Sequence, residues 1–497
     1  MISNKNVIIH PFLFGLFPIY FLYISNNVEF IEALWPMLIT LSIIIILYLI
    51  FGLISNYGLG AIVITILSLI FFSYGHIINY LRVIQFDMYG HQAYHLHRYL
   101  LLTDFVIISI LIYIIIKSPL VSKRLTKSFN IASVAIFIFP LTNSVIHTVN
   151  NLDQNISRDS SIIKSTSNNQ VINSNLPDIY YIITDGHTNS KVLKNYFNYD
   201  NTLYTETMKG KGFYIASNSN ANYAITGESI ESSLNMKYLD AGAQGSADNT
   251  ENNFVVKYLT NKNYKYYHFN SGWQGGTDLN AFATQEITCG RISEFQMMIV
   301  NSSALLILES LFGILRSESG FKILCQFDQL GKVSKFKGPK FIFSHIVSPH
   351  PPFIFDKDGG MLKRTNMTLV NWKPKSAYLG QLIFTQKKLI SVVNTIINNS
   401  VIAPIIILQG DHGPFSNHRS GNIIYDNYTT VDNIRERMGI MNMYLVPDKC
   451  KSLLSESISP VNSFRVILNC IFEEQFQILE NKHDFLGHDV TNIIMAN

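Results

Sequence analysis

Charged side chains are scarce in this sequence. Only 14% of its residues are Asp, Glu, Lys or Arg, whereas soluble proteins average about 25%, and 48% are hydrophobic. This balance excludes an ordinary soluble protein, because part of the chain must lie in lipid. The net charge is a mild +4 and the basic residues form no blocks, so no nucleic-acid partner is expected.

Cysteine is equally rare. The chain has four cysteines, Cys289, Cys325, Cys450 and Cys470, with no CxxC spacing. That number excludes a zinc knuckle and a dense disulfide framework. Cys450 and Cys470 could form one bridge if they face an oxidising compartment, and the sequence leaves open whether they do.

Long apolar runs, in contrast, fill the first 150 residues. Each is near the ~20 residues that a membrane-spanning helix needs. We therefore predict a transmembrane domain over residues 1–150 with five helices, at 7–24, 33–54, 59–80, 99–116 and 129–147. No small-residue cleavage pattern follows the first run, which disfavours a signal peptide, and the lack of an inverted repeat disfavours a transporter.

The distribution of basic residues predicts the orientation of these helices. Four of them, Lys117, Lys123, Arg124 and Lys127, lie between the fourth and fifth runs and mark that loop as cytoplasmic. Counting spans from this loop places the rest of the chain, after about residue 148, outside the inner membrane.

Two further regions follow the membrane domain. Residues 151–175 are rich in Asn and Ser and predict a linker. In residues 176–497, short β-rich runs alternate with helical segments, which predicts an α/β domain with a mostly parallel central sheet.

Polar side chains follow two of the predicted strands. Asp185 comes directly after the apolar run 178–184, and Asp411 and His412 follow the run 404–408 between two glycines. Ligand groups gather at the carboxyl ends of strands in open α/β sheets, and adjacent Asp and His can turn toward one metal ion. For Asp185 alone, a plain Asp-Gly turn is the alternative.

Thr226 precedes a helical pattern in the stretch NYAITGESIESSLN. A hydroxyl at a helix N-terminus either caps free backbone N–H groups or attacks a phosphoryl group that these N–H groups hold. Ser229 is the competing hydroxyl, and Glu228 would repel an anion if it pointed inward. A further stretch, KFIFSHIVSPHPPFIF, carries His345 at a strand end and His350 in a proline-rich loop.

Together these motifs resemble a known family. The ordered series of strand-Asp-Gly, N-Y-x-x-T before S-x-x-S-S-L-N, H-x-x-x-P-H-x-P-F and D-H-G-P is similar to the sulfatase-like branch of the alkaline-phosphatase superfamily. The likeness is greatest to membrane-anchored members related to phosphoglycerol and phosphoethanolamine transferases. It implies an alkaline-phosphatase-like α/β sandwich that acts outside the cytoplasmic membrane.

The resemblance also implies roles for individual residues. One divalent ion, zinc or manganese, would be bound by Asp185, Asp411, His412 and Thr226, and Thr226 would also be the nucleophile. His345 or His350 would contact the anionic group of the substrate. The expected activity is hydrolysis or transfer of a phosphoester, with an envelope lipid or glycan as substrate at the membrane surface.

Some residues depart from the family pattern and keep alternatives open. Asp185 stands where the transferases usually have Glu, which makes a non-catalytic envelope scaffold conceivable. The segment Thr226–Ile230 lacks the C/S-x-P-x-R motif of ordinary sulfatases, so a sulfuric ester hydrolase is the less favoured alternative. His91 and His95 could be ligands or ordinary residues of an interfacial loop, and His187 and His418 could be extra substrate contacts or surface residues.

Overall fold

The computed structural model forms two compact units. The first comprises Met1–Gln170 and Ile292–Leu315, and the second Val171–Arg291 and Arg316–Asn497. Within them the structure describes residues 7–25, 30–89, 96–118, 122–138, 140, 176–240, 245–272, 277, 280, 282–290, 292–362, 371–418 and 423–496.

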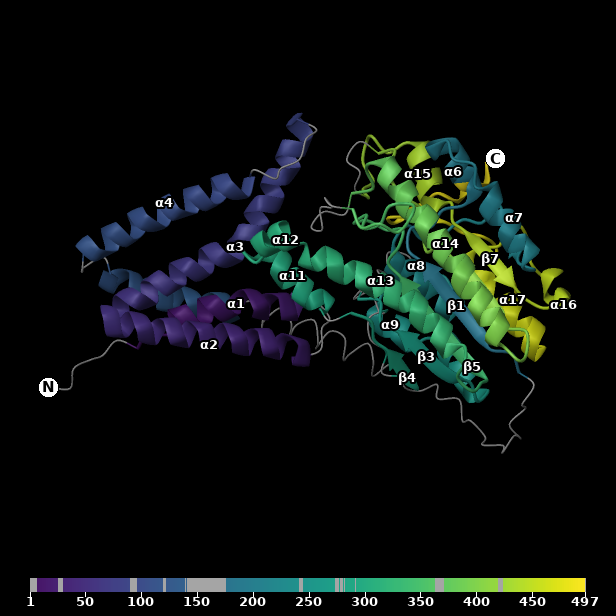
Figure 1. Ribbon diagram of the computed structural model, residues 1–497, viewed down its shortest axis with the longest axis horizontal. Helices are drawn as coiled ribbons and strands as arrows, with labels where there is room; N and C mark the ends of the chain where they lie inside the picture. The colour runs from purple at the N-terminus through teal and green to yellow at the C-terminus, as the bar shows by residue number, and fades with distance from the viewer. Residues whose placement is uncertain are drawn as a thin grey trace. The chain divides into compact units, whose positions relative to one another are not determined.

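Apolar helices form most of the first unit (Figure 1). They are α1 (His10–Ser25), α2 (Phe30–Ile54), α3 (Tyr57–Tyr89) and α4 (Leu96–Lys117), followed by helical residues 122–138. Three stretches in the described part of the chain are long and apolar enough to cross a membrane: Phe30–Ile54, Tyr57–Leu81 and His97–Lys117. These match the second, third and fourth predicted spans.

Among the described residues, three of the five predicted spans are found. The first run forms a helix of only 16 residues, about 24 Å long, whereas the hydrocarbon core is ~30 Å thick. It is shorter than its apolar run because the backbone N–H groups of Ile9 and His10 are capped by the Asn130 side chain at 3.1 Å. The end of the fifth run, the linker 151–175, and His91 and His95 lie outside the described residues.

A segment from the second half of the sequence also belongs to the first unit. It contains α11 (Glu294–Ser302) and α12 (Leu306–Phe312), joined by a short turn. Its buried side chains Phe295, Ile299 and Leu306 pack against Ile19 of α1, Ala33 of α2, and Tyr74 and Ile78 of α3. The predicted division placed this segment with the rest of 176–497. The structure differs from this prediction because apolar packing, and not chain order, decides where the segment lies.

A seven-stranded sheet is the centre of the second unit. The strands are β1 (Ile179–Thr184), β2 (Tyr214–Ile215), β3 (Lys265–Phe269), β4 (Gln285–Ile287), β5 (Lys340–Ile346), β6 (Ile405–Gln409) and β7 (Asn442–Leu445), in the order β2-β7-β6-β1-β5-β3-β4. Strands β6, β1, β5, β3 and β4 are parallel, and β7 and β2 are antiparallel to their neighbours. The expected α/β domain with a mostly parallel sheet is confirmed.

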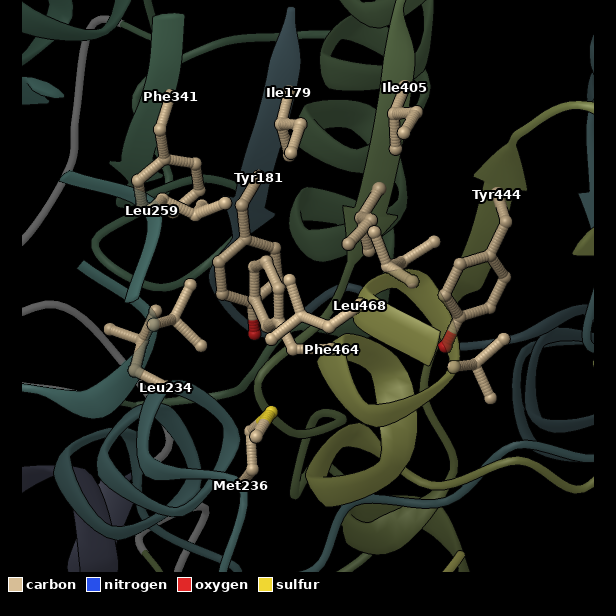
Figure 2. Packing of buried hydrophobic residues seen from close by; sticks show 14 of the residues in the cluster. Ile179, Tyr181, Leu234, Met236, Leu259, Phe341, Ile405, Tyr444, Phe464 and Leu468 are labelled. Atoms are coloured by element: carbon tan, nitrogen blue, oxygen red, sulfur yellow. The ribbon is translucent and has the colours of Figure 1, made fainter. Parts of the chain in front are cut away.

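Helices cover both faces of the sheet. One face packs against α8 (Thr226–Asn235), α10 (Phe254–Asn261) and α17 (Pro460–Phe472), and Figure 2 shows Tyr181 of β1 beside Phe464 and Leu468 in this layer. The other face packs against α7 (Thr202–Gly210), α13 (Ile314–Val333) and α14 (Lys375–Asn399). Shorter elements complete the unit: α6 (Ser190–Phe197), α9 (Ala247–Glu251), α15 (Val431–Met438), α16 (Asp448–Lys451), α18 (Thr491–Met495), β8 (Asp484–Phe485) and β9 (His488–Asp489).

All four cysteines are paired. The Cys450–Cys470 bridge, which the sequence left open, joins α16 to α17. A second bridge, Cys289–Cys325, was not predicted. Its Cα atoms are 5.8 Å apart, and it joins the two chain ends from which the segment Ile292–Leu315 leaves the second unit.

Candidate functional site

The candidate site lies at the carboxyl ends of three adjacent strands. Asp185 follows β1, His345 is near the end of β5, and Asp411 follows β6. Since β1 pairs in parallel with both neighbours, the ends of all three strands meet at one edge of the sheet. One ligand atom from each residue lies within 4.8 Å of the other two, and all three residues are buried.

Two more of the predicted residues join this cluster. The Nε2 atom of His412 is 3.2 Å from Asp411 Oδ2 and 3.5 Å from Asp185 Oδ1. The Thr226 hydroxyl is hydrogen-bonded to the same Nε2 at 3.0 Å. His345 Nε2 lies 3.3 Å from Asp185 Oδ2. The structure therefore brings together the four residues expected to hold a metal, and adds His345, which was expected to contact substrate.

Several atoms of the cluster need a partner. Among the described residues, Asp185 Oδ1 and Oδ2, Asp411 Oδ2 and His345 Nε2 are buried and accept or donate no hydrogen bond. Leaving such groups unsatisfied is costly, whereas a divalent cation would satisfy all of them. Carboxylate and imidazole donors without thiolate suit zinc or manganese. The residues present thus fit a metal ion.

Burial dominates the pKa values of these groups. Burial, with the nearby charge of Asp185, raises the pKa of Asp411 to about 7. Burial also raises the pKa of Asp185, lowers that of His345 to about 4, and lowers that of His412 well below its ordinary value. The histidines are therefore neutral near pH 7, which is the form that binds metals.

The two candidate hydroxyls have different environments. Thr226 is the first residue of α8, and the N-cap position belongs to Ile225, whose side chain cannot cap the helix. The Thr226 hydroxyl instead lies in the cluster beside His412. The Ser229 hydroxyl donates to the Asp411 carbonyl oxygen at 2.7 Å, so it holds the loop after β6.

Sequence reasoning did not identify Arg437 of α15. Its buried guanidinium donates to the Ala224 carbonyl at 2.8 Å and to the Gly413 carbonyl at 2.9 Å, and lies 5.2 Å from the centre of the Trp372 ring. Burial lowers its pKa to about 10, so it stays charged at neutral pH. Arg437 therefore ties the loop before Thr226 to the loop after β6.

Neutral side chains hold the other parts of the site. The Tyr378 hydroxyl donates to the Gly186 carbonyl at 2.8 Å, next to Asp185. Thr277 is hydrogen-bonded to His345 Nδ1 at 2.9 Å, and the Gln326 amide donates to the His345 carbonyl at 3.0 Å. These contacts orient the ring of His345 so that its Nε2 faces the carboxylates.

The remaining histidines differ in their distance from the cluster. His350 is buried beside it, with its ring 6.1 Å from that of His412 and 4.9 Å from that of Trp372. His187 is hydrogen-bonded to Thr184 and Gln386, and His418 to Asp426. Internal partners thus account for His187 and His418.

Comparison with known proteins gives only distant likenesses. No protein-family model matches the sequence, and no curated protein matches it. Among solved structures, the chain is similar to the C-terminal periplasmic domain of the phosphoethanolamine transferase EptC from Campylobacter jejuni, with 12% identity, a TM-score of 0.40, and coverage of 62% of this chain and 94% of that one.

Two other solved structures are similar to the same degree. The integral membrane lipooligosaccharide phosphoethanolamine transferase A (EptA) from Neisseria meningitidis has 12% identity, a TM-score of 0.39 and coverage of 89% of both chains. BT1596, a 2-O GAG sulfatase, has 12% identity, a TM-score of 0.39 and coverage of 61% and 71%. The function is inferred from the site itself.

Proposed function

We propose that this protein is a metal-dependent phosphoester hydrolase or phospho-group transferase at the outer face of the cytoplasmic membrane. One observation carries the proposal: the Thr226 hydroxyl, at the start of α8, lies beside a buried cluster of carboxylates and imidazoles that has unsatisfied donor atoms. A scaffold would gain nothing from such a cluster, because it costs folding free energy.

The residues of the cluster divide into two roles. Asp185, Asp411, His412 and His345 would hold the ion, which would lower the pKa of a nearby hydroxyl and screen phosphoryl oxygens. The Thr226 Oγ1 attacks phosphorus, its hydroxyl proton passes to the ester oxygen, which leaves as an alcohol, and a phosphothreonine forms. Water or an acceptor alcohol then attacks the same phosphorus and releases Thr226.

Other groups bind the anion during this step. The free N–H groups at the start of α8 and the dipole of that helix favour a negatively charged phosphoryl group next to Thr226. The position of His350, buried beside His412, supports a contact between its ring and an oxygen of the substrate. An envelope lipid or glycan phosphoester is the substrate class, because membrane helices belong to the same chain.

The proposal is tested with the full chain in detergent, loaded with zinc or manganese. Thr226→Ala should abolish hydrolysis of a chromogenic phosphodiester, Thr226→Ser should retain part of it, and Ser229→Ala should lose much less. Mass spectrometry of protein trapped with a slow phosphoester should locate the phosphate on Thr226. Near-normal turnover by Thr226→Ala would refute the covalent mechanism, and turnover of a sulfate ester alone would favour the sulfatase alternative.

A further inference from the structure

The segment Ile292–Leu315 contacts one end of the membrane helices. Its residues pack near the C-terminal ends of α1 and α3 and the N-terminal ends of α2 and α4, where they meet Leu22, Met37, Ile78 and Leu100. Figure 1 shows α11 and α12 beside α3. These four helix ends are the ones that the loop charges place on the outer side. The segment therefore approaches the helices from the side predicted for the soluble domain.

The contacts with α3 extend well inside its apolar span. The backbone N–H of Ala304 donates to the carbonyl of Phe71 at 2.8 Å. Phe71 lies ten residues before Leu81, where the span Tyr57–Leu81 ends, which is about 15 Å along the helix. The turn between α11 and α12 thus lies at the depth of the hydrocarbon core.

A glycine makes this depth possible. A Cβ atom at Gly75 would lie 2.2 Å from the Asn301 carbonyl oxygen and 2.8 Å from the Ser302 Cα, both in the backbone of α11. Only a residue without a side chain allows the two helices to approach so closely. Backbone that is not helical is tolerated at this depth when protein groups satisfy it, as Phe71 does for Ala304.

The side of α12 that does not contact α3 is apolar and exposed. Leu311 and Phe312 are 69% and 68% exposed, matching Leu102 and Phe105 of the membrane-spanning α4 at 64% and 68%. Glu294 and Glu309 are the only charged residues of the segment, which has no lysine or arginine. The exposed face is thus continuous in composition with the lipid-facing surface of the helices.

We propose that residues 292–315 form a re-entrant helical hairpin, inserted from outside, whose exposed face binds the acyl chains of outer-leaflet lipids. The Cys289–Cys325 bridge closes the base of the hairpin. The second unit is thereby connected to the bilayer through a second part of the chain, besides the predicted linker 151–175. This inference does not depend on the proposed activity.

The test places a fluorescent label on the exposed face. All native cysteines are bridged, so Leu311→Cys and Phe312→Cys each add one free thiol for bimane labelling of the full chain in proteoliposomes. Ile110→Cys on α4, 53% exposed, is the lipid-facing control, and the fully exposed Val401→Cys is the aqueous control.

Quenching by brominated acyl chains and by aqueous iodide distinguishes the outcomes. Labels at Leu311 and Phe312 should be quenched by brominated lipid at least half as strongly as the label at Ile110, and should resist iodide. Iodide quenching like that at Val401 would overturn the proposal. So would protection from both quenchers, because protein would then cover this face.

Discussion

Replacing Asp185 with Asn should have opposite effects on the metal-free and the metal-loaded protein. Asp185 and Asp411 are both buried, and the charge of Asp185 is the second cause, after burial, of the raised Asp411 pKa. Raising that pKa from 3.8 to about 7 destabilises the metal-free fold by roughly 4 kcal/mol above pH 7. Removing the charge of Asp185 should recover a part of this, on the order of 1 kcal/mol.

Asn costs little at this position because neither carboxylate oxygen of Asp185 has a hydrogen-bond partner among the described residues. In the presence of metal, the same substitution should lower the stability of the protein relative to wild type. Wild-type protein with metal at 100 times its Kd should gain about 2.7 kcal/mol, and Asp185→Asn should lose most of that gain.

Hydrogen exchange of the amides in β1 and β6, measured by mass spectrometry at pH 8, reports the stability of the second unit. Spectra with chelator and with zinc or manganese give both free energies for each protein. The reasoning is refuted if Asp185→Asn destabilises the metal-free protein, or if it keeps the full stabilisation by metal.

Three further changes test other parts of the structure. Gly75→Ala should raise hydrogen exchange throughout α11, because the added Cβ would lie 2.2 Å from the backbone of α11. The control Gly58→Ala should leave exchange unchanged, because the atom nearest to its Cβ is 3.5 Å away. Equal effects of the two substitutions would contradict the close packing at Gly75. Glu228→Gln should raise the melting temperature more at pH 8 than at pH 5. Burial raises the pKa of Glu228 to about 7, so the wild-type fold loses stability as the pH rises from about 4.5 to 7. An equal effect at both pH values would argue against the raised pKa. Thr277→Val should lower metal affinity by roughly 10- to 100-fold, because the ring of His345 loses its orienting hydrogen bond. Competition with a chelating dye measures this affinity. Unchanged affinity would exclude His345 as a ligand.

Local patterns in the sequence predicted much of this protein. Apolar run length identified three spans, because a helix in lipid needs a minimum number of apolar residues whatever its neighbours are. Alternating strands and helices predicted the mostly parallel sheet. Since strand ends in such a sheet meet at one edge, Asp185, Asp411 and His412 could be expected to lie together.

The orientation of His345 and the role of Arg437 depend on tertiary packing, which these local patterns do not contain. His345 was predicted at a strand end, but only the pairing of β5 with β1 shows that its Nε2 faces Asp185. Arg437 has no motif, because its role depends on two carbonyl groups that are distant in sequence.

The segment Ile292–Leu315 shows the same limit. Sequence reasoning assigned it to the soluble domain because it lies within residues 176–497. It packs instead on α1, α2 and α3, where Gly75 leaves room for α11. The sequence determines which side chains of a segment are apolar and can be buried. The surface against which they pack depends on contacts between residues more than 200 positions apart.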